Sequence, residues 1–496
     1  MKILFVLNNT GAFKNYDSRI KKLSQRGHKI KLIFNKFNII YPKEVFEKEF
    51  FKNKNVSYEI IPNIGRLFWK DLDERLRTSQ DFFRYYSKEY ENIHKLKERA
   101  RTWASFYVRI FGDIYLKNNP ERIFPTIKAL RKIGECIPLD KKTFRVIEKF
   151  NPDVILVSPL VSCIYNQDEW VRLANKKGIP ICWSIASWDN LTTKGIIKSN
   201  PDRVIVWNKF QKEEAIKMHH IDENKIVITG SQVFDKWFNM KPSKSREKFL
   251  QEIGLDHKKP YILYACSAEL TVPNEIEIVK DLVEKIRNSK DKKIKNLGIL
   301  IRPHPGNVEK WKNIKFQKEN VVIYPLKREM PINKETNQNY FNSIYNSAAV
   351  IGINTTTMIE AGIFDKPVLT ILLKNQSHIV QGETIHFHYL INEGLATLCK
   401  NYDEVFTNIK KYFKNKSYKK RDKEFTKKFV RPNGLNKNAT DILVREIENL
   451  KNIKKKQTKE KTILGLVFLF PIAFSFFIIY RLTQTLNQKH KSLKKY

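Results

Sequence analysis

Three observations predict an α/β protein with two Rossmann-like domains, a helical insertion and a C-terminal membrane segment. Short apolar runs of strand length alternate with helical stretches along residues 1–61 and 152–235, and again along 259–372. Apolar runs of this kind are typical of parallel strands that are buried on both faces. A stretch of helical pattern at 62–145 interrupts the alternation, and residues 462–480 carry no charge.

The N-terminal segment has the pattern of one βαβ unit. Residues 2–9, KILFVLNN, form a continuous apolar strand, and a loop that contains Gly11 follows. A helix is expected at 16–26 and a second strand at 28–35, an order typical of Rossmann-type folds. Because the loop has one glycine and no GxGxxG, the dinucleotide-binding fingerprint is absent.

The same alternation predicts the domain boundaries. We expect an N-terminal domain at 1–235, with its insertion at about 62–145, a second domain at 236–450, and a polybasic linker with a membrane tail at 451–496. Two such domains in tandem turn the carboxyl ends of their sheets toward one cleft, where ligands are expected. The remaining strands are expected at 152–160, 179–190, 202–208, 225–235, 259–268, 297–306, 321–325 and twice within 348–372.

The composition narrows the possible classes of protein. The chain has 496 residues, of which 42% are hydrophobic and 29% charged, so it is neither mostly disordered nor a polytopic membrane protein. Its net charge of +40 is compatible with nucleic acid, anionic lipid or a phosphorylated substrate as partner. The abundance of Lys, Asn and Ile also allows much of this charge to be solvated surface lysine.

Neither a disulfide framework nor a zinc site is predicted. The cysteine count is odd and no CxxC occurs, so we expect a reducing compartment. The N-terminal apolar run is five residues long, too short for the core of a signal peptide. The cysteines are Cys136, Cys163, Cys182, Cys266 and Cys399.

Residues 462–480 predict a single C-terminal membrane segment. A helix of 19 residues spans about 28 Å, close to the thickness of the hydrocarbon core. Pro471 also allows a shallow hairpin, and a buried core helix is the other interpretation. Basic residues on the two sides, six at 451–461 and five at 481–496, do not set the orientation. If the preceding domains use a cytosolic nucleotide, they must face the cytoplasm, so the orientation would follow from function and not from the flanking charges.

The stretch at 62–145 mixes aromatic and basic residues. One interpretation is an amphipathic insertion that packs its aromatic face on the sheet, and the other is a face for a membrane or a nucleic acid. Asp71 and Asp73 resemble a metal-binding DxD motif. Their helical setting and the lack of a preceding strand favour coincidence, so no metal site is expected.

Two polar motifs follow strands of the second domain. Arg302 offers a forked cation suited to phosphate, and His304 lies between two prolines that fix its backbone. Residues 354–357, Asn-Thr-Thr-Thr, open a helix, where hydroxyls and backbone N–H groups favour an anion, although an ordinary N-cap needs only one of them. Glu360 comes one turn later, positioned for ribose hydroxyls or for the helix dipole.

The first domain contributes a candidate base. Asp189 follows a strand in the segment Ser-Trp-Asp-Asn and is suited to deprotonate an acceptor hydroxyl, although Asp-Asn is also a common turn. Asp17, on the first loop, is the second candidate. Ser231 lies where the chain crosses between the domains, in a hinge or ligand loop, and His386 belongs to a polar-aromatic segment.

These motifs resemble GT-B fold glycosyltransferases of bacterial surface-polysaccharide synthesis. The tandem Rossmann-like halves, the RPHPG turn at 302–306 and the segment 354–371 are similar to those of sialyltransferases, capsule transferases and CDP-glycerol glycerophosphotransferases. The resemblance spans about residues 1–450 and implies an N-terminal acceptor domain and a C-terminal nucleotide-donor domain. It also implies that His304, Thr355 and Thr356 contact the donor phosphate and that Glu360 binds the ribose.

The chain departs from the family pattern in two places. Position 352 is Gly, so the EX7E spacing of retaining enzymes is not met and an inverting mechanism is implied. The insertion at 62–145 matches no part of the pattern.

Together these features predict a membrane-attached, metal-independent glycosyltransferase without a cofactor. Its expected partners are a nucleotide-sugar donor, a glycan or lipid-linked acceptor and an anionic membrane surface, but no nucleic acid. Arg302, His304 and Thr355–Thr357 would stabilise the leaving phosphate, with Gly11 and Ser231 in phosphate-binding loops. A glycerophosphotransferase, a sugar-nucleotide 2-epimerase of the same fold and a basic nucleic-acid-binding protein are the alternatives.

Overall fold

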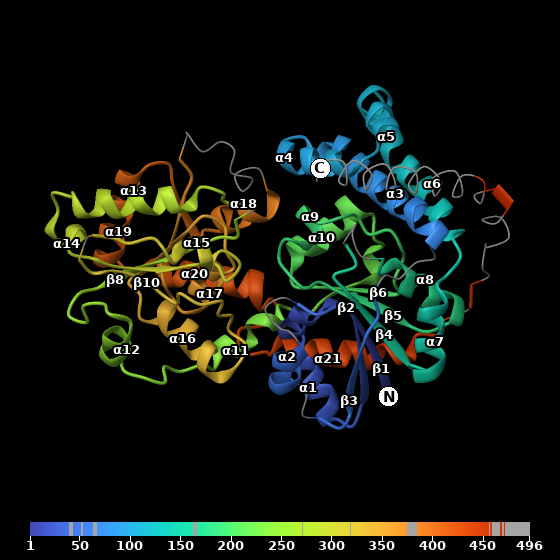
Figure 1. Ribbon diagram of the computed structural model, residues 1–496, viewed down its shortest axis with the longest axis horizontal. Coiled ribbons are helices and arrows are strands. Elements are labelled where there is room, and N and C mark those ends of the chain that lie inside the picture. The colour runs from blue at the N-terminus through green and yellow to red at the C-terminus, as the bar shows by residue number, and fades with distance from the viewer. Residues whose placement is uncertain are drawn as a thin grey trace, which may run out of the picture. The chain divides into compact units, whose positions relative to one another are not determined.

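The protein folds into two compact units. The computed structural model describes residues 1–38, 43–50, 53–62, 67–161, 166–269, 271–317, 319–373, 384–455, 457–458, 467–468 and 471. The first unit comprises 1–206, 210–228 and the chain from Asp441, and the second comprises 207–209 and 229–440. Each unit is built on one parallel β-sheet (Figure 1).

The first sheet has seven parallel strands in the order β3-β2-β1-β4-β5-β6-β7. The order reverses between β1 and β4, because the chain adds β2 and β3 on one side of β1 and β4 to β7 on the other. Ile3 of β1 pairs with Ile30 of β2 and Val154 of β4. The strands are β1 (Lys2–Asn9), β2 (Lys29–Lys36), β3 (Val56–Ile60), β4 (Val154–Ser158), β5 (Ile181–Ser184), β6 (Arg203–Val206) and β7 (Ile226–Ile228).

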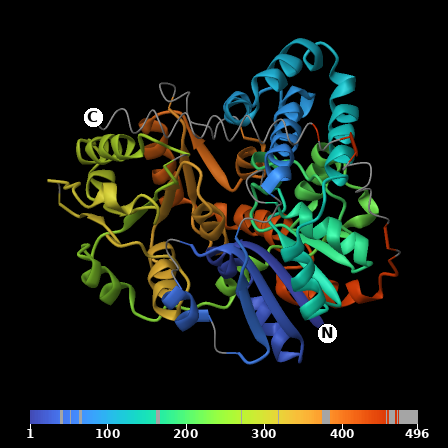
Figure 2. The same ribbon diagram turned by 45° about the vertical axis from the view of Figure 1, so that its right-hand side comes forward.

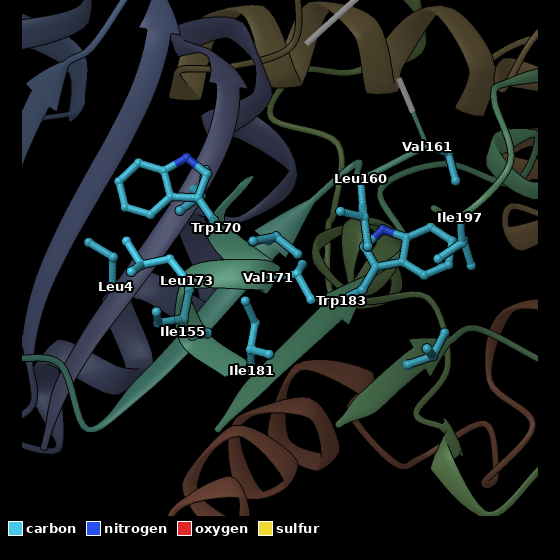
Figure 3. Close-up of a cluster of buried hydrophobic side chains, with 14 of the residues drawn as sticks. Leu4, Ile155, Leu160, Val161, Trp170, Val171, Leu173, Ile181, Trp183 and Ile197 are labelled. Carbon is cyan, nitrogen blue, oxygen red and sulfur yellow. The ribbon is translucent and has the colours of Figure 1, made fainter. Parts of the chain in front are cut away.

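Helices cover this sheet and bury a core rich in tryptophan. Trp170 and Trp183 are completely buried, and Figure 3 shows them among Leu173, Ile155 and Ile181. Burial on this scale is the main source of stability for a parallel sheet. The helices of the first unit outside the insertion are α1 (Asp17–Gln25), α2 (Lys43–Phe50), α7 (Lys141–Phe150), α8 (Asp168–Lys177), α9 (Asn190–Thr193), α10 (Lys209–His219) and α21 (Ala439–Asn449).

The insertion is helical, as the sequence pattern predicts. Its longest helices, α3 and α6, pack against each other and enclose a small core with Trp69, Leu72 and Leu76. The insertion lies beyond the carboxyl ends of the strands of the first sheet, and α5 projects from it (Figures 1 and 2). Its helices are α3 (Leu67–Phe83), α4 (His94–Trp103), α5 (Phe106–Ile110), a π-helical turn (Phe111–Leu116) and α6 (Ile123–Glu135).

The second sheet has six parallel strands in the order β10-β9-β8-β11-β12-β13, and the order reverses between β8 and β11. Its strands are β8 (Tyr261–Ala265), β9 (Gly298–Arg302), β10 (Val321–Ile323), β11 (Ala349–Gly352), β12 (Val368–Ile371) and β13 (Ala396–Cys399). Its helices are α11 (Asp235–Phe238), α12 (Arg246–Ile253), α13 (Glu275–Arg287), α14 (Lys292–Lys295), α15 (Val308–Trp311), α16 (Lys334–Tyr345), α17 (Thr357–Ile363), α18 (Ile385–Asn392), α19 (Tyr402–Lys414) and α20 (Tyr418–Phe425).

The last described helix returns to the first unit. Glu448 of α21 accepts hydrogen bonds from Arg26 at 2.7 Å and from His28 at 2.9 Å, and Asp441 pairs with Lys22. The sequence pattern places the end of the second domain at residue 450, whereas the structure groups the chain from Asp441 with the first unit. These ion pairs, with partners more than 400 residues away in sequence, account for the difference.

The predicted membrane segment at 462–480 lies outside the described residues, apart from 467, 468 and 471. Among the described helices, none combines the length and the apolar character that a membrane crossing requires.

A test of the core is the substitution Leu173→Ala. Leu173 is fully buried on α8 between sheet and helices, so we expect a loss of about 2–5 kcal/mol in the free energy of unfolding of the first unit. Arg145→Ala, on the exposed face of α7, is the control and should change stability by less than about 0.5 kcal/mol. Urea titration measures both, and equal effects of the two substitutions would contradict the packing described here.

Candidate functional site

The reversal of strand order in the second sheet places two loops side by side at its carboxyl edge. Ser267 follows β8 and Asn354 follows β11, and the Asn354 N–H donates to the Ser267 hydroxyl at 3.4 Å. Asn307, beyond β9, donates its side-chain amide to the Ser267 carbonyl at 3.1 Å. Ligands of open α/β sheets bind at such a reversal. The loops that follow β8, β9 and β11 therefore form the candidate site.

A buried carboxylate dominates this site. One oxygen of Glu360 accepts a hydrogen bond from the Trp237 indole N–H at 3.0 Å, and the other accepts one from the Tyr340 hydroxyl. The Tyr340 hydroxyl also contacts the Thr357 hydroxyl at 2.7 Å. These two hydrogen bonds orient the Glu360 carboxylate.

Tyr340 and Arg302 form the wall behind this carboxylate. Burial, together with the adjacent Glu360, raises the pKa of Tyr340 well above its ordinary value, so the phenol stays protonated and can donate. The Arg302 guanidinium lies 5.0 Å from the centre of the Tyr340 ring and pairs with the buried Glu329 at 3.3 Å. It also donates to the Ser343 hydroxyl at 3.1 Å. These contacts hold the Arg302 guanidinium beside the Tyr340 ring, and its phosphate role stays a prediction.

His304 follows β9 with a defined tautomer. Its Nδ1 accepts a hydrogen bond from the Gly306 N–H at 3.1 Å, so a neutral ring carries its proton on Nε2. A donor at Nε2 suits a phosphate oxygen. The imidazole is half-buried, as expected for a side chain at the rim of a site.

The three threonines differ in their surroundings. Thr356 is exposed, Thr357 is buried, and the Thr355 hydroxyl lies 3.1 Å from that of Thr357. Thr355 therefore connects to the carboxylate network through Thr357. Asn354 extends the set in the other direction, with its amide 3.4 Å from Nε2 of the buried His386. Residues 381–383, in the same predicted segment as His386, lie outside the described residues.

Glu275 is a site residue that the sequence motifs did not reveal. Its carboxylate accepts the Ser267 N–H at 2.8 and 3.0 Å, which fixes the loop after β8. Burial raises the pKa of Glu275 to about 8, although the hydrogen bonds from Ser267 partly oppose this effect. The only sequence signal is an acid in the first turn of α13, a common feature of helices.

The candidate base Asp189 lies at the carboxyl edge of the first sheet. Its carboxylate accepts the Thr193 hydroxyl at 3.0 Å and pairs with Lys194 at 3.3 Å. Asp17 is exposed at the start of α1 and accepts the Ser18 N–H at 2.6 Å. Gly11 lies in the 3-10 turn after β1, where a Cβ atom would approach the Asn38 side chain to 2.7 Å.

Ser231 is completely buried in the second unit. Its N–H donates to the Val430 carbonyl at 2.8 Å, and Gly230 before it has a φ of +86°, a conformation that favours glycine. Nearby, Asp235 pairs with Arg431 at 2.8 Å and accepts the Thr440 N–H at 2.7 Å. These contacts describe a structural joint within the second unit. Ser231 precedes α11, the helix whose Trp237 donates to Glu360, and its phosphate-binding role stays a prediction.

Within the described part of the chain, no group of three or more His, Cys, Asp or Glu side chains is arranged to hold a metal ion. Asp73 instead pairs with Arg77 on the same helix at 3.0 Å.

The chain resembles solved structures of nucleotide-sugar enzymes in its fold. UDP-GlcNAc 2-epimerase from Neisseria meningitidis, bound to UDP-GlcNAc, is 14% identical, with a TM-score of 0.52 over 90% of this chain and 100% of that one. The UDP-GlcNAc 2-epimerase from Methanocaldococcus jannaschii is 14% identical, with a TM-score of 0.51 over 90% and 99%. A glycosyltransferase from Rickettsia africae is 12% identical, with a TM-score of 0.50 over 92% and 99%.

Neither a protein-family model nor a curated protein matches the chain. At these identities the likeness establishes the fold alone. The chain has the GT-B-type architecture of two parallel α/β units, which the sequence motifs predicted and which epimerases and glycosyltransferases share.

The pKa of Glu275 predicts a pH dependence of stability. The folded protein retains a proton up to about pH 8 that the unfolded chain releases near 4.5. The protonated Glu275 carboxyl therefore contributes to the free energy of unfolding. This contribution is complete below the pKa of Glu275 in the unfolded chain and is lost as the pH rises through its pKa in the folded protein. We expect the wild type to lose up to about 1.4 kcal/mol per pH unit in this window relative to Glu275→Gln. Urea titrations across pH measure the difference.

The matched control for this measurement is Glu277→Gln on the exposed side of α13. Its stability should keep the pH dependence of the wild type. A Glu275→Gln profile parallel to that of the wild type would show that Glu275 does not carry this proton.

Proposed function

We propose that the protein is a glycosyltransferase that binds a nucleotide-activated sugar at the carboxyl edge of its second sheet. The observation that carries this proposal is the buried Glu360 carboxylate, which Trp237 and Tyr340 orient beside the hydroxyls that follow β11. An oriented carboxylate is suited to accept hydrogen bonds from the two ribose hydroxyls. The similarity of fold to enzymes that bind UDP-GlcNAc supports the same assignment.

The phosphates of the donor would lie across the loops after β9 and β11. His304 donates from Nε2, and the exposed Thr356 hydroxyl and the Asn354 amide provide further donors. Charge that develops on the leaving phosphate is stabilised by such fixed donors in the transition state. Arg302 acts in this scheme by holding Tyr340 and Glu329 in place.

The reaction we propose is a direct, inverting displacement. The acceptor oxygen forms a bond to the anomeric carbon, the bond from that carbon to the donor's phosphate oxygen breaks, and its electron pair leaves with the nucleotide. Asp189 takes the proton of the acceptor hydroxyl, and its contacts with Thr193 and Lys194 fix the direction of its lone pairs. Asp17 is the second candidate for this base.

Membrane attachment belongs to the same proposal. Residues 462–480 would anchor the chain, with the two units in the cytoplasm, where nucleotide sugars are made. Basic residues that flank this segment would contact anionic head groups.

A nucleotide-sugar 2-epimerase is the second candidate function. The specific observation in its favour is the fold similarity to two UDP-GlcNAc 2-epimerases. An epimerase converts its substrate without an acceptor, so incubation with a nucleotide sugar alone separates the two functions: an epimerase yields an isomeric nucleotide sugar, and a transferase does not.

Nucleotide binding is tested by thermal unfolding of the full chain with UDP-, GDP-, CMP- and CDP-activated sugars. A donor at a hundred times its dissociation constant should add about 2.7 kcal/mol of stability. Glu360→Gln and Thr356→Ala should each weaken binding about tenfold or more, because each removes a polar contact to the nucleotide. Glu335→Gln, at the exposed start of α16, is the control and should leave binding unchanged. The site assignment is wrong if no donor stabilises the protein.

The role of Asp189 is tested with the donor that this screen identifies. Asp189→Asn should lower the rate of nucleotide release from that donor by about 10²–10⁴-fold and leave its dissociation constant unchanged, because the base acts only in the transfer step. The control is Asp202→Asn, because Asp202 is a carboxylate of the first unit that pairs with Lys455 and has no role in the proposed reaction. If Asp189→Asn keeps the full rate and Asp17→Asn loses it, Asp17 is the base.

A further inference from the structure

A cavity lies next to the position at which the strand order of the first sheet reverses. It measures about 270 Å³ and lies where Asn8 of β1 meets the loop after β4, represented by Pro159 and Val161. The helical insertion forms its other wall, with Arg84, Trp103 and neighbouring residues. The insertion therefore encloses the position at which an open α/β sheet binds its ligand.

The charges around this cavity favour an anion. Its lining contains three cations, Arg84, Arg99 and Lys194, and one carboxylate, Asp81. That carboxylate already pairs with the buried Lys198 at 3.2 Å and accepts the N–H of Ile196 at 2.6 Å. Lys194 pairs with Asp189 at 3.3 Å, which leaves Arg84 and Arg99 without an ion-pair partner among the described residues.

Arg84 provides the most specific evidence. Its side chain is completely buried, and its guanidinium lies 4.8 and 4.9 Å from the ring centres of Tyr85 and Tyr90. Nη2 donates to the Lys194 carbonyl and to the Tyr85 hydroxyl. Its Nε and Nη1 atoms have no hydrogen-bond partner among the described residues. Buried donors of this kind are costly unless a ligand accepts from them.

The mouth of the cavity continues into an exposed apolar surface. Trp103 lines the cavity and is 45% exposed, and the Arg99 guanidinium lies 5.8 Å from its ring centre. The chain then enters α5 and the π-helical turn, where Phe106 is 62%, Tyr107 81% and Ile114 66% exposed. We call this surface the aromatic tip; its members are Trp103, Phe106, Tyr107, Ile110, Phe111, Ile114 and Tyr115.

The aromatic tip has the composition of a membrane-interface segment. Aromatic rings with polar edges are favoured at the level of the lipid head groups. Residues 94–128 contain eight Lys or Arg and three Asp or Glu, so the surroundings of the tip attract anionic lipid. In Figures 1 and 2, α5 is the part of the insertion that projects farthest from the first sheet, as insertion into an interface requires.

From these observations we infer that the cavity binds the phosphate-bearing head group of a membrane lipid, and that the aromatic tip enters the bilayer from which this lipid comes. The lipid is the acceptor, so the inference rests on the proposed transfer reaction and specifies its second substrate. Arg84 places its positive charge in the wall of the cavity, and Arg99 and Lys194 contact the phosphate from the mouth. A hydroxyl of the head group then lies at the carboxyl edge that contains Asp189.

The first experiment measures head-group binding by the full chain. The probe is a fluorescent polyprenyl phosphate in neutral detergent micelles, compared with the uncharged polyprenol and with inorganic pyrophosphate. We expect binding of the polyprenyl phosphate alone. Arg99→Ala and Lys194→Ala, both on exposed side chains that can change without loss of fold, should each weaken it about tenfold. Lys141→Ala, on exposed α7, should have no effect.

The second experiment tests the aromatic tip. An environment-sensitive fluorescent amino acid replaces Tyr107 in the full chain, and Glu148 on α7 is the control position. Phosphatidylcholine vesicles with phosphatidylglycerol should shift the emission at position 107 to the blue, and brominated lipids should quench it. The control position should not respond, whether or not the C-terminal segment attaches the chain to the same vesicles.

Other outcomes overturn the inference. Equal binding of pyrophosphate and polyprenyl phosphate would assign the cavity to a soluble anion, and binding that Arg99→Ala and Lys194→Ala leave intact would place the lipid elsewhere. A fluorescence change at position 107 that follows protein concentration without vesicles would make the tip an interface between copies of the chain. Stabilisation by nucleotide sugars in these variants reports on the proposed function separately, because it depends on the second unit.

Discussion

The constraint on which both units depend is the geometry of the parallel sheet. A parallel strand needs a crossover that covers one face of the sheet, so both faces are buried and all carboxyl ends lie at one edge. At the position where the strand order reverses, the crossovers from two neighbouring strands run to opposite sides of the sheet. The loops at the carboxyl ends of these strands therefore separate and leave a space between them. In this chain the reversals fall between β1 and β4 and between β8 and β11. The two groups of functional candidates lie at these two positions.

Each reversal is built around a buried charge, with opposite signs in the two units. The Glu360 carboxylate accepts hydrogen bonds from Trp237 and Tyr340, and two N–H groups of Arg84 have no hydrogen-bond partner among the described residues. A buried charge is expensive unless it is paired, so its retention requires a compensating partner. The first charge is suited to hydroxyls and the second to an anion. This difference agrees with the two proposed roles, ribose binding in the second unit and phosphate binding in the first.

Much of the fold was predictable because apolar strands and amphipathic helices leave local periodic signals. The strands β3 and β13 were missed, since each is a short edge strand without a continuous apolar run. The sequence pattern located His304 just after a strand and Glu360 in the first turn of a helix, and their roles stay predictions. Trp237 and Tyr340 were not predictable, because Trp237 reaches Glu360 across 123 residues and no local pattern encodes such a contact. The ion pair between Arg302 and Glu329 was not predictable either, because Glu329 belongs to no motif.

The exposed side chains of the aromatic tip are the main argument for a membrane partner. The insertion has a core of its own, so the exposed rings of α5 and the π-helical turn are not needed to hold it together. Each ring left in water forgoes the stabilisation that burial of an aromatic side chain provides, about 1.5–3 kcal/mol. Several such rings lie beside Trp103, at the mouth of a cationic cavity. In a protein whose substrates were all soluble, this exposed apolar surface would promote aggregation and serve no purpose. In the membrane contact that we propose, a bilayer that presents an anionic acceptor would remove this cost and pair with the excess of positive charge.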